Sequence, residues 1–331
     1  MAERKTPATR RGVHVDPLAI AFAGVTVIAI GWFFFPPYWL TVATIMAMYS
    51  LPALGLLLLL GYAGQPSFGH AAFFGLGAYA SALATTKLGW PSLAGAGLGV
   101  AVSAISAFIV GLPLLRVRGH YLAIATLAFA IIVQGLLENL TWLTNGVAGI
   151  GRIPSLGDTD VAFVITLGIA TVTYVIAAII DHGRVGTILR ALGDDEIAMA
   201  SCGISPVIVK TGVFVVSAVL ASVSGSIYAH YLTYISPESF DVNASVLFVT
   251  MMIIGGTGRI WAGLIGAIVI GAIPAMLSDY SSYSALFYGI AIIAVLLFFP
   301  NGMLGIGQQI RAGIRSFRRR GAAASAGSKP E

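Results

Sequence analysis

Residues 38–60 read YWLTVATIMAMYSLPALGLLLLL, a run of 23 residues without a charged side chain. An α-helix needs about 20 predominantly apolar residues to cross the hydrocarbon core of a bilayer. An uncharged run of this length therefore predicts a transmembrane helix rather than a helix of a soluble domain.

Runs of the same kind fill most of the chain and are separated by Pro, Gly or short polar breaks. They cover 17–36, 38–60, 69–87, 92–115, 121–142, 160–180, 209–232, 243–257, 260–278 and 283–300. Only 9% of the 331 residues are charged, whereas a soluble domain carries roughly 25%. We therefore expect an all-α, polytopic membrane bundle of about ten transmembrane helices, with a single membrane domain at 17–300.

The distribution of basic residues predicts the direction of each helix, because Lys and Arg concentrate in cytoplasmic loops. With ten spans and a cytoplasmic N-terminus, 16 of the 18 basic residues face the cytoplasm, and only Lys87 and Arg152 face outward. A re-entrant segment at 61–87 would reverse the orientation of every later span and so move the basic residues of the later loops to the other side. Ten spans with both termini in the cytoplasm is the best solution.

Three segments are expected outside the membrane. Residues 1–16 form a basic arm, residues 301–331 a basic, partly disordered tail, and residues 181–208 a cytoplasmic loop. The basic arm before an apolar run resembles a signal peptide, but no small-residue cleavage pattern follows, so the first span is expected to be retained. The basic residues lie at the ends of apolar runs rather than on one face, which argues against nucleic-acid binding. The single Cys202 excludes an intrachain disulfide framework and a cysteine-only metal site.

The loop at 181–208 is the longest polar stretch between spans. An apolar face is expected from Ile188, Leu189, Leu192, Ile197, Met199 and Ala200. Asp194 and Asp195 are placed to begin a helix and Gly203 to end it. Such a short amphipathic helix either docks into a groove of a partner or lies on the inner leaflet, and the spacing does not separate the two.

A glycine-rich break, GYAGQPSFGHAAFFGLGAY, follows the second run at 61–79. Backbone freed by Gly and Pro at membrane depth must be buried in protein or line a wet cavity. Gln65, Ser67 and His70 would then be polar groups near the cytoplasmic mouth. Gly69, Gly75 and Gly77 are better explained by close helix packing, while the role of Gln65 and Ser67 stays open.

A similar break recurs at 255–263, GGTGRIWAG, and hints weakly at a duplicated unit. Ionisable residues inside the runs are scarce. Glu138 and His230 lie near the outer ends of their runs, where we expect them to anchor at the interface. No buried acid–base relay is visible, so the energy for transport should come from another polypeptide.

The chain lacks the Gly-Lys-Ser/Thr of a P-loop, since its Lys-Thr pairs at Lys5 and Lys210 follow Arg4 and Val209. If ATP drives transport, a partner must bind it. An ion-coupled secondary carrier that works alone would instead need buried coupling residues, and a channel would need a filter of carbonyls or charged rings.

Several segments together resemble the branched-chain amino-acid ABC permeases of the LivM type, in family order: 61–75, 118–127, 183–184 with 190–198, 228–231 with 235–240, and 255–258. The resemblance implies a sister permease as a heterodimer partner, two ATP-binding subunits that hold ATP and Mg, and a periplasmic or lipid-anchored binding protein. It also implies a multi-pass protein of the bacterial inner membrane that binds no cofactor or metal itself and is not an enzyme. Relatives of this type carry leucine, isoleucine and valine, but also urea, amides and aromatic acids.

The glycine-rich breaks and the resemblance together give three sets of candidate residues. The ATPase-coupling loop would use Arg184, Arg190, Asp194, Asp195, Glu196 and Gly203. The candidates for the translocation pathway are Gln65, Ser67, Phe68 and His70. The structural glycine breaks are Gly61, Gly64, Gly69, Gly255, Gly256 and Gly258.

Overall fold

The computed structural model describes residues 17–117, 119–256, 259–276 and 289. The longer helices are α1 (Pro17–Phe34), α2 (Pro37–Leu56), α3 (His70–Lys87), α4 (Ser92–Leu114), α5 (His120–Asn139), α7 (Thr159–His182), α8 (Arg184–Asp194), α10 (Pro206–Leu232), α11 (Val242–Gly255) and α12 (Ala262–Met276). The shorter elements are η1 (Leu57–Tyr62), α6 (Thr141–Thr144), η2 (Gly146–Ala148), β1 (Ile150–Gly151), α9 (Glu196–Ser201), β2 (Tyr234–Ile235) and η3 (Pro237–Phe240). The arm 1–16, the tenth run at 283–300, the tail 301–331 and Gly258 lie outside the described residues.

The chain is a polytopic helical membrane protein. In the part that the structure describes, six helical segments are long and apolar enough to cross a bilayer. These are Pro37–Tyr62, Ser92–Leu114, His120–Asn139, Thr159–His182, Pro206–Leu232 and Pro237–Gly255. Shorter apolar stretches lie in α1 and α12. The first nine runs expected from the sequence all fall on helices.

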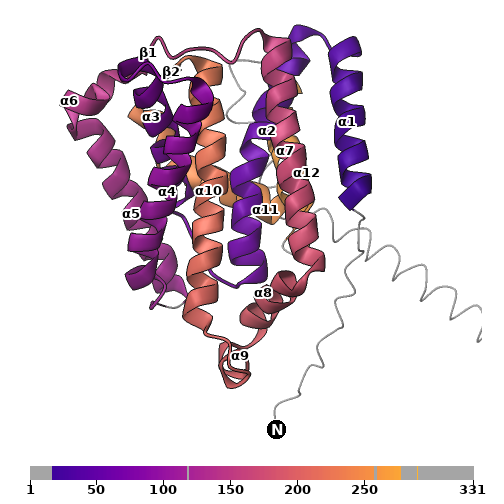
Figure 1. The fold of residues 1–331 in the computed structure, drawn as a ribbon, viewed down its shortest axis with the longest axis vertical. Coiled ribbons are helices and arrows are strands. Elements are labelled where there is room, and N and C mark those ends of the chain that lie inside the picture. The colour runs from indigo at the N-terminus through magenta and orange to yellow at the C-terminus, as the bar shows by residue number, and fades with distance from the viewer. Residues whose placement is uncertain (1–16, 118, 257–258, 277–288, 290–331) are drawn as a thin grey trace, which may run out of the picture.

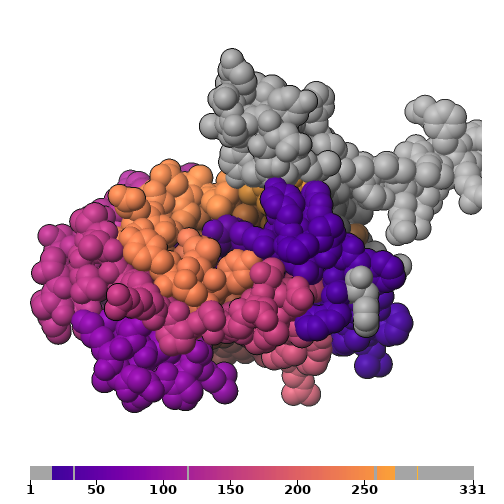
Figure 2. Space-filling model, turned by 90° about the horizontal axis from the view of Figure 1, so that it is seen from above, coloured from indigo at the N-terminus to yellow at the C-terminus, as the bar shows by residue number. Residues whose placement is uncertain are grey.

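The long helices lie side by side, and the bundle has two distinct ends (Figure 1). α8 and α9 lie at one end, below the helices that they connect, and the two-stranded β1–β2 pairing lies at the other. Figure 2 looks onto the β1–β2 end and shows the segment around β2 and η3 (orange) between the α5–α6 end (magenta) and the start of α2 (indigo). The loop at 181–208 therefore projects from one end of the bundle.

α2 is the central helix of the bundle. Its membrane segment is 72% buried inside the chain, whereas that of α4 is 22% buried. The outer helices expose large apolar side chains, among them Phe22, Ile105, Ile124 and Val172. Apolar surface of this extent is suited to lipid or to another membrane subunit.

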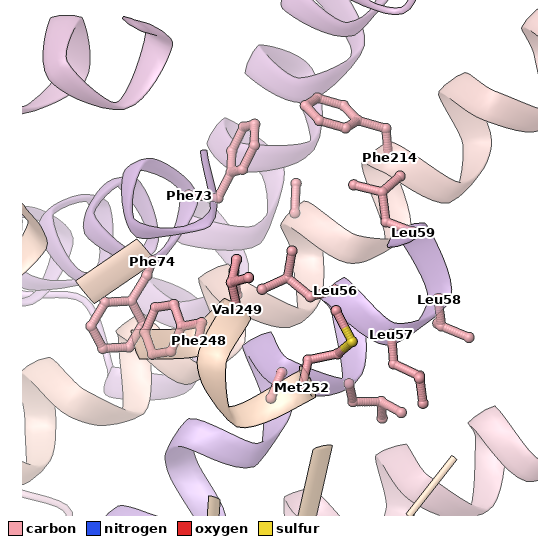
Figure 3. Close-up of a cluster of buried hydrophobic side chains, with 14 of the residues drawn as sticks. Leu56, Leu57, Leu58, Leu59, Phe73, Phe74, Phe214, Phe248, Val249 and Met252 are labelled. Atoms are coloured by element: carbon pink, nitrogen blue, oxygen red, sulfur yellow. The ribbon is translucent and has the colours of Figure 1, made fainter. Parts of the chain in front are cut away.

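Aromatic and leucine side chains fill the centre of the bundle (Figure 3). The ring of Phe74 lies 5.2–6.2 Å, centroid to centroid, from the rings of Tyr49, Tyr228, Phe240 and Phe248. Leu56, Leu57, Leu58 and Leu59 at the end of α2 pack in the same core. This core joins α2, α3, α10 and α11.

The glycines of α3 allow close helix packing, as the sequence predicted. A Cβ built at Gly77 would lie 2.3 Å from the carbonyl oxygen of Ser222 in α10, and one at Gly75 would lie 3.0 Å from Phe240. A glycine also makes room between α1 and α7, where a Cβ at Gly31 would lie 2.6 Å from the Phe163 ring, a side-chain contact, whereas at Gly77 the neighbour is backbone. Close backbone approach of this kind is typical of helices that associate in a membrane.

The expectation that His230 anchors at the interface is wrong. His230 is 2% exposed, and its Nδ1 donates to the carbonyl oxygen of Pro154 at 2.7 Å. Its Nε2 lies 2.9 Å from the Ser81 hydroxyl oxygen, the second hydrogen-bond partner of the ring. Two hydrogen-bond partners explain how a polar ring is kept inside the bundle.

Candidate functional site

The loop between α7 and α10 forms two short helices, α8 and α9, which we call the coupling segment (residues 184–201). The expectation of one helix begun by Asp194 and Asp195 is wrong in this respect. Asp194 is the last residue of α8, and Asp195 alone caps α9 by accepting from the backbone N–H groups of Ile197 (2.8 Å) and Ala198 (3.1 Å). Asp195 has extended backbone angles, which interrupt the helix between α8 and α9.

Gly203 follows α9 in the left-handed region, with φ of +81°. This conformation is favourable for glycine and common directly after a helix. The expected helix stop at Gly203 is thus confirmed.

α8 packs against the end of α2. Leu189 and Leu192 are buried, and Gly193 lies so close to η1 that a Cβ there would be 2.3 Å from the carbonyl oxygen of Tyr62. The guanidinium carbon of Arg190 lies 5.8 Å from the centroid of the Tyr62 ring, within cation–π distance. The coupling segment is therefore in direct contact with the start of the glycine break.

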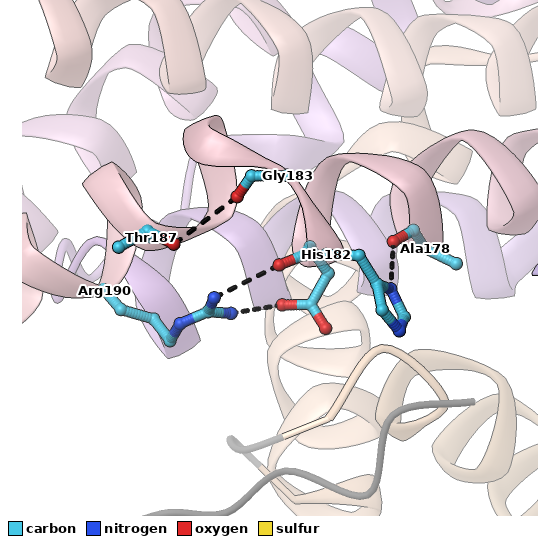
Figure 4. A network of polar contacts seen from close by, with 6 residues as sticks. Ala178, His182, Gly183, Thr187 and Arg190 are labelled. Atoms are coloured by element: carbon cyan, nitrogen blue, oxygen red, sulfur yellow. Dashed lines mark hydrogen bonds and ion pairs between the residues drawn. The ribbon is translucent and has the colours of Figure 1, made fainter. Parts of the chain in front are cut away.

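Arg190 also joins α8 to the end of α7 (Figure 4). Its guanidinium forms an ion pair with the Asp181 carboxylate and donates to the Asp181 carbonyl oxygen at 3.1 Å. The side chains of Arg190 and Asp181 are 43% and 20% exposed. An ion pair with this much solvent contact stabilises only weakly.

A second ion pair, between Glu196 in α9 and Lys210 in α10, is much more enclosed. The side chain of Lys210 is 7% exposed and that of Glu196 is 27% exposed. The sequence placed Lys210 at the cytoplasmic end of its helix without assigning it a role. Lys210 lies four residues after Pro206, the first residue of α10. The sequence alone does not indicate its partner, because the pairing with Glu196 depends on how the preceding loop folds.

The coupling segment also keeps an exposed face. Ile197 is 74% exposed and Val185 is 53% exposed, while Arg184 and Asp194 are also exposed. Of the predicted apolar face, Leu189, Leu192 and Met199 are buried in the chain itself, whereas Ile197 and Ala200 are exposed. The coupling segment therefore packs against the bundle with one face and presents a mixed apolar and charged surface to another molecule with the other.

The first glycine break begins in η1, which follows α2 directly. Leu57–Tyr62 form a π-helix, η1, which includes Gly61, and Gly64 follows with φ of +66°. π-Helical turns are rare and occur frequently at functional sites. The break ends at Gly69, where a Cβ would lie 3.1 Å from the carbonyl oxygen of Thr126, and α3 starts at His70.

Side chains from other helices hold the start of α3. The hydroxyl of Thr126 accepts from the Phe68 N–H at 2.9 Å, and that of Ser245 accepts from the Ala71 N–H at 3.0 Å. The Nε2 atom of His70 lies 2.5 Å from Oγ of Ser217 in α10. The first turn of a helix has free N–H groups, and here α11 supplies the acceptor for that of Ala71, while α5 holds the residue before the N-cap.

The predicted pathway residues lie together but inside the chain. Ser67 and His70 are 2% and 1% exposed, with Oγ of Ser67 3.4 Å from Nδ1 of His70. Gln65 is 4% exposed, and neither its side-chain oxygen nor its side-chain nitrogen has a hydrogen-bond partner within the described structure. A buried amide without partners is costly, so Gln65 is the polar residue of this group that its own packing does not explain.

The described part of the second glycine break lies between α11 and α12. A Cβ at Gly255 would lie 1.7 Å from the carbonyl oxygen of Ala262, and Gly256 has φ of +105°. Both positions therefore need glycine for steric reasons. Within the described ranges, no cluster of three or more His, Cys, Asp or Glu residues could hold a metal ion.

Comparison with known proteins identifies permease components of one kind of transport system. Residues 38–296 match the family described as the permease component of the branched-chain amino acid transport system. The LivM permease proteins of that high-affinity system in Salmonella typhimurium and Escherichia coli K12 are each 32% identical over 312 residues, covering 84% of this chain and 73% of theirs. The LivH permease protein of Escherichia coli K12 is 26% identical, covering 79% of this chain and 92% of its own.

No solved structure gives a significant match to the chain. The family match covers most of the sequence and includes both glycine breaks and the coupling segment. A transporter subunit is thereby favoured over the ion-coupled carrier that works alone. The chain belongs to the family of permease components of branched-chain amino acid transport systems.

Proposed function

We propose that this chain is one transmembrane half of an ATP-binding-cassette importer and takes up branched-chain amino acids or a related small polar solute. The observation that carries the proposal is the coupling segment, which projects from one end of the bundle and contacts η1 through Arg190 and Gly193. A displacement of α8 would be transmitted through these contacts directly to the start of the glycine break.

The proposal includes partners that supply the energy and the substrate. Two ATP-binding subunits, which hold ATP and Mg, would dock on the exposed face of the coupling segment around Arg184, Asp194 and Ile197. A sister permease would complete the pathway, and a periplasmic or lipid-anchored binding protein would deliver the solute. The chain itself would bind no cofactor and catalyse no covalent step.

The topology proposed from the basic residues is ten spans with both termini in the cytoplasm of a bacterial inner membrane. The domain division is 1–16 as arm, 17–300 as membrane domain and 301–331 as tail. In Figure 1 the start of α1 lies toward the end of the bundle that carries α8 and α9. This arrangement supports a shared side for the N-terminus and the coupling segment.

The translocation pathway is proposed to pass the break at Gln65, Ser67, Phe68 and His70. Gln65 supports this, because its buried amide has both a donor and an acceptor without a partner in the described structure. An amino-acid backbone carries complementary groups. Movement of the break would let Gln65 bind the solute in another state of the transporter.

Affinity purification of the tagged chain from native membranes, with mass spectrometry of the bound proteins, tests the assembly. We expect a second permease and one or two ATP-binding subunits to co-purify. Uptake of radiolabelled leucine into vesicles should stop on ATP depletion and survive collapse of the ion gradients. Competition by isoleucine and valine, compared with urea, amides and aromatic acids, identifies the substrate class.

Recovery of the chain alone, with uptake that follows the ion gradient, would contradict the proposal. Replacement of Ile197 in α9 by Asp is a sharper test of the docking face. It adds a charge at a 74% exposed apolar position and leaves the buried residues of α8 unchanged. The ATP-binding subunits should then be lost. The same change at Val147, which is 65% exposed in η2 next to β1 and lies outside the candidate membrane spans, is the control and should leave them bound.

A further inference from the structure

The two ion pairs of the coupling segment differ in what they join. Arg190 and Asp181 join α8 to α7, and both remain accessible to water. Glu196 and Lys210 join α9 to α10 across the linker 202–205, and the lysine is almost fully enclosed. A surface ion pair opens easily, whereas separation of a buried pair leaves an uncompensated charge inside the protein.

The linker between α9 and α10 would by itself permit movement. It contains Gly203 in the left-handed region, and Cys202 and Gly203 are exposed. The Glu196–Lys210 pair spans this linker and removes that freedom. α9 and the first turns of α10 therefore form one body, while α8 is held to α7 by the weaker contact.

α10 carries this connection into the bundle. It is a single helix of 27 residues, and its only proline is at the first position. Ser217 lies seven residues after Lys210, which places both on the same face two turns apart. Its hydroxyl contacts His70 at the start of α3, and its backbone lies against Gly55 of α2, where a Cβ would be 2.9 Å from the Ser217 carbonyl oxygen.

We propose that Lys210 is a positioning residue for transport: paired with Glu196, it makes α9 and α10 move together, so that displacement of α9 shifts Ser217 and with it His70 and the break before α3. The inference rests on the proposed function, because it assumes that an ATP-binding subunit moves the coupling segment. The polar contacts Glu196–Lys210 and Ser217–His70 lie at the two ends of this connection, and each has discrete arrangements that a displacement can exchange.

The test compares transport with ATP hydrolysis in the purified complex, reconstituted in vesicles with its partner subunits. Lys210→Met removes the buried charge and leaves Glu196, which solvent can reach. We expect co-purification of the ATP-binding subunits and ATP hydrolysis to stay within twofold, while solute uptake per ATP hydrolysed falls at least tenfold. The charge-swapped variant Glu196→Lys with Lys210→Glu should restore at least half of that ratio.

Asp181→Asn is the matched control, because it breaks the exposed pair of the same segment. Its uptake per ATP should remain within twofold of the unaltered complex. If Lys210→Met is not recovered from membranes, the double variant Glu196→Gln with Lys210→Gln removes both charges and carries the same comparison.

A merely structural role of Lys210 predicts less complex but an unchanged ratio of uptake to ATP hydrolysis, and that result would overturn the inference. So would a ratio that falls equally in Asp181→Asn. If the unaltered chain does not retain ATP-binding subunits at all, the proposed function itself fails, and the two failures are thereby distinguished.

Discussion

Gly225 in α10 lies against Phe74 in α3 so closely that a Cβ at position 225 would be 1.9 Å from the Phe74 carbonyl oxygen. The Phe74 backbone cannot make room for a Cβ at position 225 unless α3 moves. The contact lies beside the aromatic cluster that Phe74 forms with Tyr228, Phe240 and Phe248. The spacing between α3 and α10 is thus set by the absence of one side chain.

The first prediction is that Gly225→Ala destabilises the bundle by about 1–3 kcal/mol or more, since overpacking forces a backbone shift. Thermal unfolding of the purified chain in detergent measures the effect. Gly212→Ala on the same helix is the control, because nothing lies within 4 Å of its Cβ position. It should leave stability unchanged or slightly raised. Equal stability of the two variants would contradict the proposed packing.

The second prediction separates stability from transport at Gln65. Gln65→Leu removes a buried amide that has no partner in the described structure, so thermal stability should be kept or raised, whereas solute uptake should fall at least tenfold. Gln134→Leu makes the same chemical change where the amide donates to Glu138 at 2.9 Å. That control should lose about 0.5–1.5 kcal/mol of stability and keep uptake. Normal uptake by Gln65→Leu would remove Gln65 from the pathway.

The third prediction concerns the cap of α9. Asp195→Ala removes the acceptor for the N–H groups of Ile197 and Ala198, and N-cap losses cost about 0.5–2 kcal/mol. Because α9 is short and largely exposed, the loss should appear as weaker retention of the ATP-binding subunits, with little change in thermal unfolding. Asp195→Asn should restore retention, as Asn also caps helices well.

Asp158→Ala is the matched control for the cap. Asp158 occupies the N-cap position of α7, outside the coupling segment, and its side chain makes no cap hydrogen bond there. Its replacement should leave retention of the subunits unchanged, and a loss as large as that in Asp195→Ala would contradict the role of the cap.

The fourth prediction is that Asp181→Asn changes the free energy of unfolding by no more than about 1 kcal/mol, since its ion pair with Arg190 is partly exposed. Arg190→Ala should cost more, because it also removes the contact with the Tyr62 ring. Thermal unfolding of both variants at low and high salt gives the comparison. A larger loss in Asp181→Asn than in Arg190→Ala would contradict the weak role of this pair.

Much of the architecture follows from local sequence. Uncharged runs of about 20 residues predict helices wherever they occur, because unpaired backbone groups are too costly in lipid. The first nine runs fall on helices for this reason. Gly69, Gly75 and Gly77 were also predictable as packing positions, since small residues are what closely packed membrane helices share.

The candidate site was predicted in its location but not in its contacts. Asp195 and Gly203 act locally, on groups within three residues or on their own backbone, so the sequence indicates both roles. The split of the coupling segment into α8 and α9 was missed, because Asp194 and Asp195 are equally good caps by type. The burial of His230 was missed as well, since its partners Ser81 and Pro154 are 149 and 76 residues away.

The sequence by itself determined that this protein is a helical membrane protein, roughly which stretches form its long helices, and which family it belongs to. Those properties depend on hydrophobicity, helix capping and motifs, all of which are written within short stretches of chain. Only the tertiary structure decided that Lys210 pairs with Glu196, that Ser217 reaches His70, and that Gln65 is buried without a partner. These relationships depend on which helix faces meet, and in a chain apolar on nearly every face the hydrophobic pattern does not distinguish one face from another.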